Sequence, residues 1–371
     1  MAVLHVLRLA TQQFRNLADG EIFPCETVNV IYGGNAQGKT NLLEAVTYLS
    51  TGKAFRTRKE QELIQFGADF ADLEADVLAK NREKTLRAVL FTGRKPRQLF
   101  LNGVKQKNFT TMEGELTTVL FCPEDLLILK SGAEKRRRLL DNALCQLRPG
   151  YSRALQEYQR LLDHKSRILK DWRDRPSYLD ALPDFNLRMA QFGAALIAYR
   201  ANYLQKLARL TAQYHREFSG DREQLALTYR TVSTVLDPLA ARAEIERQIL
   251  DHQESHLRAE IESGQCLTGP HRDDFEVVCN DLPLKSFGSQ GQVRTAAISL
   301  KLAEREIFRD DTGEMPVLLL DDVLSELDEG RQDFLLNQLR AGQVFITCCE
   351  DRKFTKLGAV LHIAGGALQP E

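Results

Sequence analysis

The sequence lacks the features that mark membrane-spanning and secreted proteins. No apolar run among its 371 residues approaches the roughly 20 residues that span a bilayer. The first residues, from Met1 to Arg8, alternate like a β-strand and contain no basic segment followed by an apolar core, so no secretory signal is predicted. These absences favour a cytoplasmic protein without a membrane partner.

The cysteines lack the spacing of a metal-binding or disulfide framework. The chain has seven of them, an odd number, and no pair forms a CxxC motif. Most stand in apolar, strand-like segments, as reduced core thiols do. Cys348 and Cys349 are adjacent, so on a strand their side chains would face opposite ways. A metal site built on cysteine is therefore not expected.

An excess of charge of one sign is also missing. Lysine and arginine total 50 against 51 aspartates and glutamates, which leaves a formal net charge of −1. Contact with a polyanion would therefore depend on a local basic patch, because the global field gives no sign of one. The hydrophobic content of 43% and the charged content of 27% are those of an ordinary globular protein.

The most informative motif that is present is a phosphate-binding loop. It reads Gly33, Gly34, Asn35, Ala36, Gln37, Gly38, Lys39 and Thr40, a full GxxxxGK[ST] pattern. A β-branched strand candidate precedes it and apolar residues at helical spacing follow it. Backbone N–H groups and the helix dipole hold phosphates in such loops. We expect Lys39 to reach the β- and γ-phosphates and the Thr40 hydroxyl to bind Mg²⁺. The alternative is a glycine turn capped by Thr40.

Two acids follow a fully apolar strand candidate, residues 317–320. Such a strand is typical of a parallel sheet that is covered on both faces, and ligands bind at the carboxyl ends of its strands. We expect Asp321 to hold Mg²⁺, directly or through water. Asp322 would orient or deprotonate the attacking water. The alternative is a strand that ends in a polar turn.

A third motif begins a long helical segment. Ser289, Gln290, Gly291 and Gln292 stand where ATP-binding-cassette (ABC) ATPases have their signature motif, whose helix N-terminus and serine contact a γ-phosphate. Ser289 and Gln292 also satisfy a capping box, a purely structural interpretation. Residues 325–328 follow the acid pair in the position of the D-loop of these ATPases.

These motifs occur in the order and register of ABC-type ATPases, and the finer pattern resembles the bacterial RecF family of recombinational DNA repair. The resemblance runs from end to end. It includes residues 14–17, 35–45, 55–57, 123–126 and 135–141, and its most specific parts are 269–274 and 289–292. It implies an α/β fold: an ABC-ATPase head, which is a P-loop NTPase with a mixed β-sheet and flanking helices, plus an inserted α-helical lobe. Residues 1–130 and 263–371 would form the two parts of the head.

Helical stripes fill the intervening segment, 131–262, which we assign to the lobe. The resemblance likens the head to those of Rad50 and SMC proteins, with a short lobe in place of long coiled arms. It implies ATP and Mg²⁺ as cofactors and a head-to-head homodimer. Residues 33–40, Asp321 and Asp322 would serve the nucleotide of their own chain, while Ser289–Gln292 would complete the site of the partner chain.

The implied activity is a weak, DNA-stimulated ATPase in which Lys39 and Asp322 act in catalysis. Most ABC ATPases have glutamate in place of Asp322, and the shorter side chain fits slow hydrolysis. ATP binding would close the dimer on double-stranded DNA or single-strand/double-strand junctions, and hydrolysis would release it. With RecR and RecO, the protein would promote RecA loading at gaps and stalled forks, in the cytoplasm at the nucleoid.

Two basic clusters are candidates for DNA contact. One consists of Lys53, Arg56, Arg58 and Lys59, the other of Lys135, Arg136, Arg137 and Arg138; either could equally be a solvated face.

Two other functions stay open. A transporter's nucleotide-binding subunit is disfavoured because residues 347–349 lack its switch histidine and the lobe is large. A Rad50-like nuclease partner is disfavoured by the missing CxxC hook.

Overall fold

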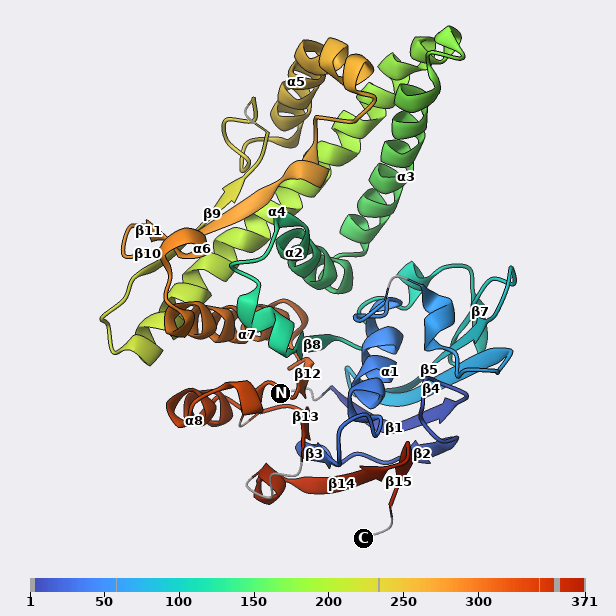
Figure 1. Cartoon of the computed structure of the whole chain (residues 1–371), viewed down its shortest axis with the longest axis vertical. Helices are drawn as coiled ribbons and strands as arrows, with labels where there is room; N and C mark the ends of the chain where they lie inside the picture. Colours follow the sequence, from blue (N-terminus) through green and yellow to red (C-terminus); the bar gives the residue numbers. More distant parts are fainter. Residues whose placement is uncertain (1–3, 58, 233, 340, 350–353, 370–371) are drawn as a thin grey trace. The chain divides into compact units, whose positions relative to one another are not determined.

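The computed structural model describes residues 4–57, 59–232, 234–339, 341–349 and 354–369 (Figure 1). The chain forms two compact units. The first combines Met1–Leu127 with Ala297–Glu371 and is called the head unit here; the second, Ile128–Ala296, is called the lobe unit. Within the described residues, no helix has both the length and the apolar character needed to cross a bilayer.

A mostly parallel sheet forms the centre of the head unit. Its strands are β3 (Val28–Tyr32), β8 (Thr118–Phe121), β12 (Val317–Asp321), β13 (Val344–Cys348), β14 (Ala359–Ala364) and β15 (Ala367–Leu368). They lie in the order β15-β14-β3-β13-β12-β8, and only β15 runs antiparallel to its neighbour. Every residue of β12 and β13 is buried, which explains their continuous apolar sequence.

The second sheet of the head unit is antiparallel. It consists of β1 (His5–Gln12), β2 (Gly20–Ile22), β4 (Phe70–Ala79), β5 (Arg82–Phe91), β6 (Gln98–Leu101) and β7 (Val104–Gln106), in the order β2-β1-β4-β5-β6-β7. Burial alternates along the whole of β4, as expected for a strand with one face on the core. Asn102 and Gly103 join β6 to β7, and both have positive φ, which is the backbone of a tight hairpin turn.

Helix α1 (Lys39–Thr51) packs against strands of both sheets (Figure 1). Its residues Leu42, Leu43 and Val46 belong to one apolar core with side chains from β1, β4 and β12. The remaining elements of the head unit are η1 (Glu60–Leu63), η2 (Phe109–Thr111), η3 (Pro123–Leu127), η6 (Leu324–Glu326), α8 (Glu329–Asn337) and η7 (Phe354–Leu357). Helix α7 (Gln290–Thr312) starts in the lobe unit and continues into the head unit. The predicted α/β head with flanking helices is confirmed.

Long helices dominate the lobe unit. They are α2 (Ala133–Leu147), α3 (Pro149–Asp171), α4 (Leu182–Ser219) and α5 (Arg242–Ser263), with the short segments η4 (Pro176–Ala181), η5 (Pro270–Arg272) and α6 (Leu284–Phe287). Helices α3 and α4 lie side by side (Figure 1). Pro176 and Pro183 stand in the first turns of η4 and α4, where the missing N–H would have no intrahelical partner.

The lobe unit also contains a small sheet, which differs from the purely helical segment predicted up to residue 262. Strand β9 (Leu225–Arg230) pairs antiparallel with β10 (Asp274–Cys279), and β11 (Leu282–Pro283) adds to β10. This pairing ties residues beyond 262 to the lobe, so the compact unit extends to Ala296. The alternation of larger apolar residues (Leu225, Leu227 and Tyr229) with small or polar ones along β9 was the signal that the sequence offered. The division at 130 and 262 into functional domains stays a prediction.

A buried ionic network holds the segment 269–274 within the lobe unit. Arg200, which is 2% exposed, donates from Nη2 to Asp141 Oδ1 at 2.8 Å and from Nη1 to the Pro270 carbonyl at 2.7 Å. The Tyr229 hydroxyl donates to Asp273, whose carbonyl accepts from Arg137 Nη1 at 2.6 Å. A buried charge is tolerated only when it is paired in this way. The segments 135–141 and 269–274 of the family pattern are thus joined, directly through Arg137 and indirectly through Arg200.

His271 is a neutral member of this segment. Its Nδ1 lies 2.7 Å from the Tyr158 hydroxyl and its Nε2 lies 3.3 Å from the Cys266 carbonyl oxygen. A neutral ring satisfies both contacts, because Nδ1 then accepts and Nε2–H donates. Burial lowers the pKa of His271 to about 4. Since its pKa in the unfolded chain is about 6.5, the unfolded chain binds the proton first as the pH falls, and stability decreases below pH 6.5.

We therefore expect acid to destabilise the wild-type protein more than a His271→Gln variant. The linkage amounts to about 2 kcal/mol of unfolding free energy between pH 7 and pH 5. Urea unfolding of both proteins at the two pH values measures the difference. His164→Gln, on the exposed side of α3, is the matched control and should retain the wild-type pH dependence. Equal pH sensitivity in wild type and His271→Gln would contradict the assignment.

Candidate nucleotide-binding site

The predicted phosphate loop joins the end of β3 to the start of α1. Gly38 precedes the helix with a φ of 109°, a left-handed backbone that favours glycine, and a Cβ there would lie 2.7 Å from Leu17 Cδ2. Glycine at this position also offers no capping side chain to the first turn of α1. The N–H groups at this helix end are therefore suited to bind an anion.

Lys39 lies over the loop that contains it. Its Nζ donates to the carbonyl oxygens of Gly33 at 2.7 Å and Gly34 at 2.9 Å, and it contacts Cys349 Sγ at 3.3 Å. The side chain is 7% exposed. A cation held against carbonyls at the mouth of a glycine loop is positioned to exchange those contacts for phosphate oxygens.

Residues outside the motif hold the loop in place, a role that the sequence did not predict for them. Asn16 Nδ2 donates to the Ala36 carbonyl at 2.8 Å and Asn16 Oδ1 accepts from Asn41 at 2.6 Å. A Cβ on Gly33 would lie 2.1 Å from the Ile363 carbonyl oxygen, so only glycine fits beside β14. The one available signal was Asn16, inside the 14–17 part of the family pattern.

Asp321 and Thr40 meet at the carboxyl end of β12. Thr40 Oγ1 donates to Asp321 Oδ1 at 2.7 Å, and Thr347 Oγ1 donates to the same oxygen at 2.9 Å. Burial raises the pKa of Asp321, while the two hydroxyls and the charge of Arg56 oppose that rise. An octahedral Mg²⁺ with bonds of about 2.1 Å needs adjacent oxygens about 3 Å apart. The Thr40 and Asp321 oxygens fit that ion.

Asp322 is held in an unusual backbone conformation beside this pair. Its φ is 51°, in the left-handed region that few non-glycine residues adopt, and its N–H donates to Thr347 Oγ1 at 2.8 Å. Its Oδ1 is buried and makes no hydrogen bond to the described residues. A carboxylate oxygen in that state is available to a water or a ligand. Thr347 therefore orients both acids, a role that the sequence did not indicate.

The first basic cluster follows α1 in the head unit. Lys53, Arg56 and Lys59 are exposed, whereas Arg58 lies outside the described residues. Arg56 is close enough to Asp321 for its charge to lower the pKa of that carboxyl group. Arg56 therefore contributes positive potential to the candidate nucleotide site.

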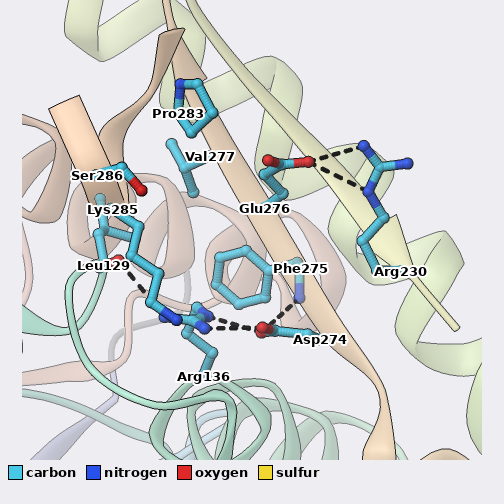
Figure 2. Close-up of a pocket in the computed structure, with 10 residues that line it drawn as sticks. All are labelled: Leu129, Arg136, Arg230, Asp274, Phe275, Glu276, Val277, Pro283, Lys285 and Ser286. Atoms are coloured by element: carbon cyan, nitrogen blue, oxygen red, sulfur yellow. Dashed lines mark hydrogen bonds and ion pairs between the residues drawn. The ribbon is translucent and has the colours of Figure 1, made fainter. Parts of the chain in front are cut away.

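The second basic cluster, on α2 in the lobe unit, is only partly at the surface. Arg136 is 3% exposed and donates from Nε and Nη2 to the two carboxylate oxygens of Asp274, both at 2.7 Å. It lines a pocket of about 410 Å³ on β10, where Arg230 also pairs with Glu276 (Figure 2). The structure thus corrects the expectation that Arg136 contacts DNA, because its buried guanidinium already forms an ion pair with Asp274. Arg137 is half-buried, and Arg138 and Lys135 are exposed.

The predicted signature segment begins α7 in the lobe unit. Gln292 N donates to Ser289 Oγ at 3.2 Å and Ser289 N donates to Gln292 Oε1 at 3.0 Å, so the capping box is formed. The Ser289 oxygen is the acceptor in this box, which leaves its own proton available to a ligand. Ser289 and Gln290 are exposed, and Gly291 and Gln292 are half-buried. Gln292 Nε2 also donates to Glu223 Oε1 at 2.9 Å.

Comparison with known proteins agrees with this geometry. A family model described as RecF/RecN/SMC N terminal domain matches residues 5–366. A DNA replication and repair protein RecF from Acetivibrio thermocellus is 37% identical over 351 residues, which is 95% of each chain. Its counterpart from Ruminiclostridium cellulolyticum is 35% identical over 353 residues, covering 95% of this chain and 94% of its own.

Solved structures give the same result. One described as the recombination mediator protein RecF-ATPrS in the RecFOR pathway superposes with a TM-score of 0.92 at 33% identity, over 99% of this chain and 98% of its own. An Smc head domain from Pyrococcus furiosus, with a TM-score of 0.55 and 13% identity, shares the fold alone. Together with the family match along almost the whole sequence, these likenesses show that the chain belongs to the RecF family of DNA replication and repair proteins.

Proposed function

We propose that this chain is an ATP-switched, DNA-binding recombination mediator. The observation that carries the proposal is the 2.7 Å hydrogen bond from Thr40 Oγ1 to Asp321 Oδ1. It joins the phosphate loop to the carboxyl end of strand β12, where Asp321 is the last residue. It supplies two hard oxygen ligands at the end of the loop that also contains Lys39. Such a set suits a nucleoside triphosphate with its Mg²⁺. A structure described as RecF-ATP, 33% identical to this chain, supports ATP as that nucleotide.

In this proposal each residue has one role. The backbone of residues 33–38 and Lys39 bind the phosphates, Thr40 and Asp321 hold Mg²⁺, and Asp322 accepts the proton of the attacking water. The bound Mg²⁺ would neutralise charge on the β- and γ-phosphates. The aspartate at 322 reaches less far than a glutamate would, which favours weak, slow hydrolysis. Binding of DNA would stimulate this hydrolysis.

The signature segment would complete the nucleotide site of a second copy. Ser289 is exposed at the N-terminus of α7 and its hydroxyl proton is available, so it can donate to a γ-phosphate presented by a partner. ATP would then join two heads, and hydrolysis would separate them. A homodimer that uses two identical composite sites also satisfies the two-fold symmetry of most protein dimers.

The dimer would bind DNA. The exposed Lys53, Arg56, Lys59, Lys135 and Arg138 supply local positive charge that could contact the backbone of double-stranded DNA or of strand junctions. Relatives described as replication and repair proteins, and a solved neighbour placed in the RecFOR pathway, support a role with RecR and RecO that promotes RecA loading at gaps and stalled forks. Such work would take place in the cytoplasm, at the nucleoid. Membership of the family argues against the transporter and Rad50-like alternatives.

A mixing experiment tests the composite site. Lys39→Ala chains lack a working phosphate loop and Ser289→Arg chains lack a working signature, so neither variant should dimerise with ATP in size-exclusion chromatography. In a one-to-one mixture, each mixed dimer combines one intact loop with one intact signature. ATP-dependent dimers should therefore reappear only in the mixture. Dimers that persist in both single variants, or a mixture that stays monomeric, would contradict the proposal. Lys53→Ala is the control and should dimerise as wild type does.

A further inference from the structure

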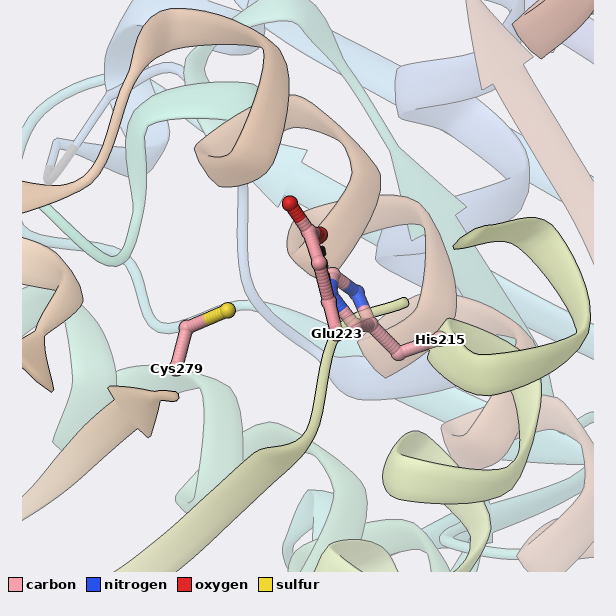
Figure 3. Close-up of side chains that lie close together, drawn as sticks. All are labelled: His215, Glu223 and Cys279. Carbon is pink, nitrogen blue, oxygen red and sulfur yellow. Dashed lines mark hydrogen bonds and ion pairs between the residues drawn. The ribbon is translucent and has the colours of Figure 1, made fainter. Parts of the chain in front are cut away.

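Three potential metal ligands of different chemistry lie together in the lobe unit (Figure 3). His215 comes from the last turns of α4, Glu223 from the loop between α4 and β9, and Cys279 is the last residue of β10. One ligand atom from each lies within 4.8 Å of the others. His215 and Cys279 are buried and Glu223 is half-buried. These positions do not form a spacing motif in the sequence, and the fold brings them together.

The backbone holds each of the three positions independently of any ion. Helix α4 ends at Gly220, whose φ of 60° turns the chain toward Glu223. Cys279 pairs with Leu225 across the β9–β10 ladder. One step beyond that pair, Asn280 N donates to the Gln224 carbonyl at 2.9 Å and Gln224 N donates to Asn280 Oδ1 at 2.8 Å. The backbone that carries the three ligands is therefore held in place before any ion binds, as a metal site needs.

We propose that His215, Glu223 and Cys279 bind a zinc ion. Zinc accepts nitrogen, oxygen and sulfur ligands together, whereas Mg²⁺ and Ca²⁺ select oxygen alone. Tetrahedral bonds of about 2.0–2.3 Å place ligand atoms about 3.3–3.6 Å apart, so side-chain shifts of about an ångström suffice. A thiolate and a carboxylate also neutralise the two positive charges of the ion. The fourth position is left for water.

The competing interpretation is an ordinary hydrogen-bonded pair beside a core thiol. His215 Nε2 and Glu223 Oε2 are 2.9 Å apart, and this contact is close to the separation of two ligands on one ion. Binding of zinc through Cys279 would release the thiol proton to solvent.

An ion at this site would also fix the signature segment. Glu223 Oε2 faces His215, while its other oxygen accepts from Gln292 Nε2 at 2.9 Å. Gln292 Oε1 in turn accepts from Ser289 N at 3.0 Å. A carboxylate locked by zinc therefore holds, through one amide, the serine assigned to the partner's γ-phosphate. This consequence rests on the proposed function, whereas zinc binding itself does not.

Metal analysis of the full-length protein provides the first test. Protein purified without chelator and dialysed against metal-free buffer should retain about one zinc per chain. Replacement by Co²⁺ should give a thiolate-to-cobalt charge-transfer band, which Cys279→Ser should abolish. Cys145→Ser, which removes another buried thiol, should leave the band intact. A wild-type protein without the band, or a band that survives in Cys279→Ser, would overturn the proposal.

A second variant guards against misfolding of Cys279→Ser. His215→Gln should weaken zinc binding at least about 10-fold in competition with a chromophoric chelator, while His252→Gln should not. Equal affinity of wild type and His215→Gln would count against the site. Hydrogen exchange at 289–292 should slow when zinc is added, and no change there would refute the link to the signature. Neither readout uses ATP, so a failure of the composite-site experiment would leave zinc binding untouched.

Discussion

A Lys39→Ala variant is expected to bind ATP at least about 100-fold more weakly than the wild-type protein, because contacts to charged groups contribute about 1.5–3 kcal/mol each. The ammonium would contact both the β- and the γ-phosphate, so two such contacts are lost together. Its present partners, the Gly33 and Gly34 carbonyls, can accept from water when the lysine is removed, so the loop itself should survive. Equilibrium binding of a fluorescent ATP analogue measures the change.

Two controls separate this effect from a loss of folding. Lys53→Ala removes an exposed lysine just after α1 and should leave ATP affinity within a factor of two. The thermal unfolding midpoint of Lys39→Ala without nucleotide should match that of the wild type. An ATP affinity within threefold of wild type in Lys39→Ala would show that the loop does not bind phosphate through this side chain.

An Asp322→Asn variant is expected to bind ATP normally and to hydrolyse it at least about 100-fold more slowly, since a general base contributes about 10²–10⁴-fold to a rate. Asparagine has nearly the same shape and keeps the backbone bond to Thr347, so only the charge and the proton acceptor are lost. Among the described residues nothing donates a hydrogen bond to the buried Asp322 Oδ1, so this oxygen is the candidate proton acceptor whose charge the substitution removes. Single-turnover hydrolysis of radiolabelled ATP measures the rate.

The same variant should trap the closed state. With ATP present, Asp322→Asn should remain dimeric in light scattering long after the wild-type protein has returned to monomers. Asp310→Asn, which removes an exposed carboxylate on α7, should behave as wild type. Turnover at the wild-type rate in Asp322→Asn would eliminate Asp322 as the base, even if the dimer persisted.

Contiguous motifs allowed the candidate nucleotide site to be predicted from the sequence. The loop at 33–40, the apolar strand before Asp321 and the helix after Ser289 each carry their signal within a few residues. Their local periodicity predicts a strand, a turn or a helix without knowledge of distant partners. The contact between Thr40 and Asp321 then followed from the rule that ligands gather at the carboxyl ends of parallel strands.

Side-chain partners from distant segments could not be read in this way. Arg136 stands in a run of basic residues that looks like a solvated surface, yet Asp274 pairs with it from 138 positions away. Thr347 orients both acids only because β13 lies beside β12. His215, Glu223 and Cys279 share no motif at all. In each case the deciding term is a buried electrostatic contact, which depends on the complete fold.

The discontinuous head unit also sets an order for folding during synthesis. Within the described part of the chain, strand β3, which precedes the candidate phosphate loop, pairs with β13 and β14, and roughly 300 residues separate it from β13. At roughly 5–20 residues per second, the ribosome takes about 15–60 s to supply that partner. The lobe unit is continuous in sequence and can fold in the meantime. We therefore expect a nascent or truncated chain that ends before Val344 to fold its lobe unit but to leave β3, and with it the candidate phosphate loop, without neighbouring strands.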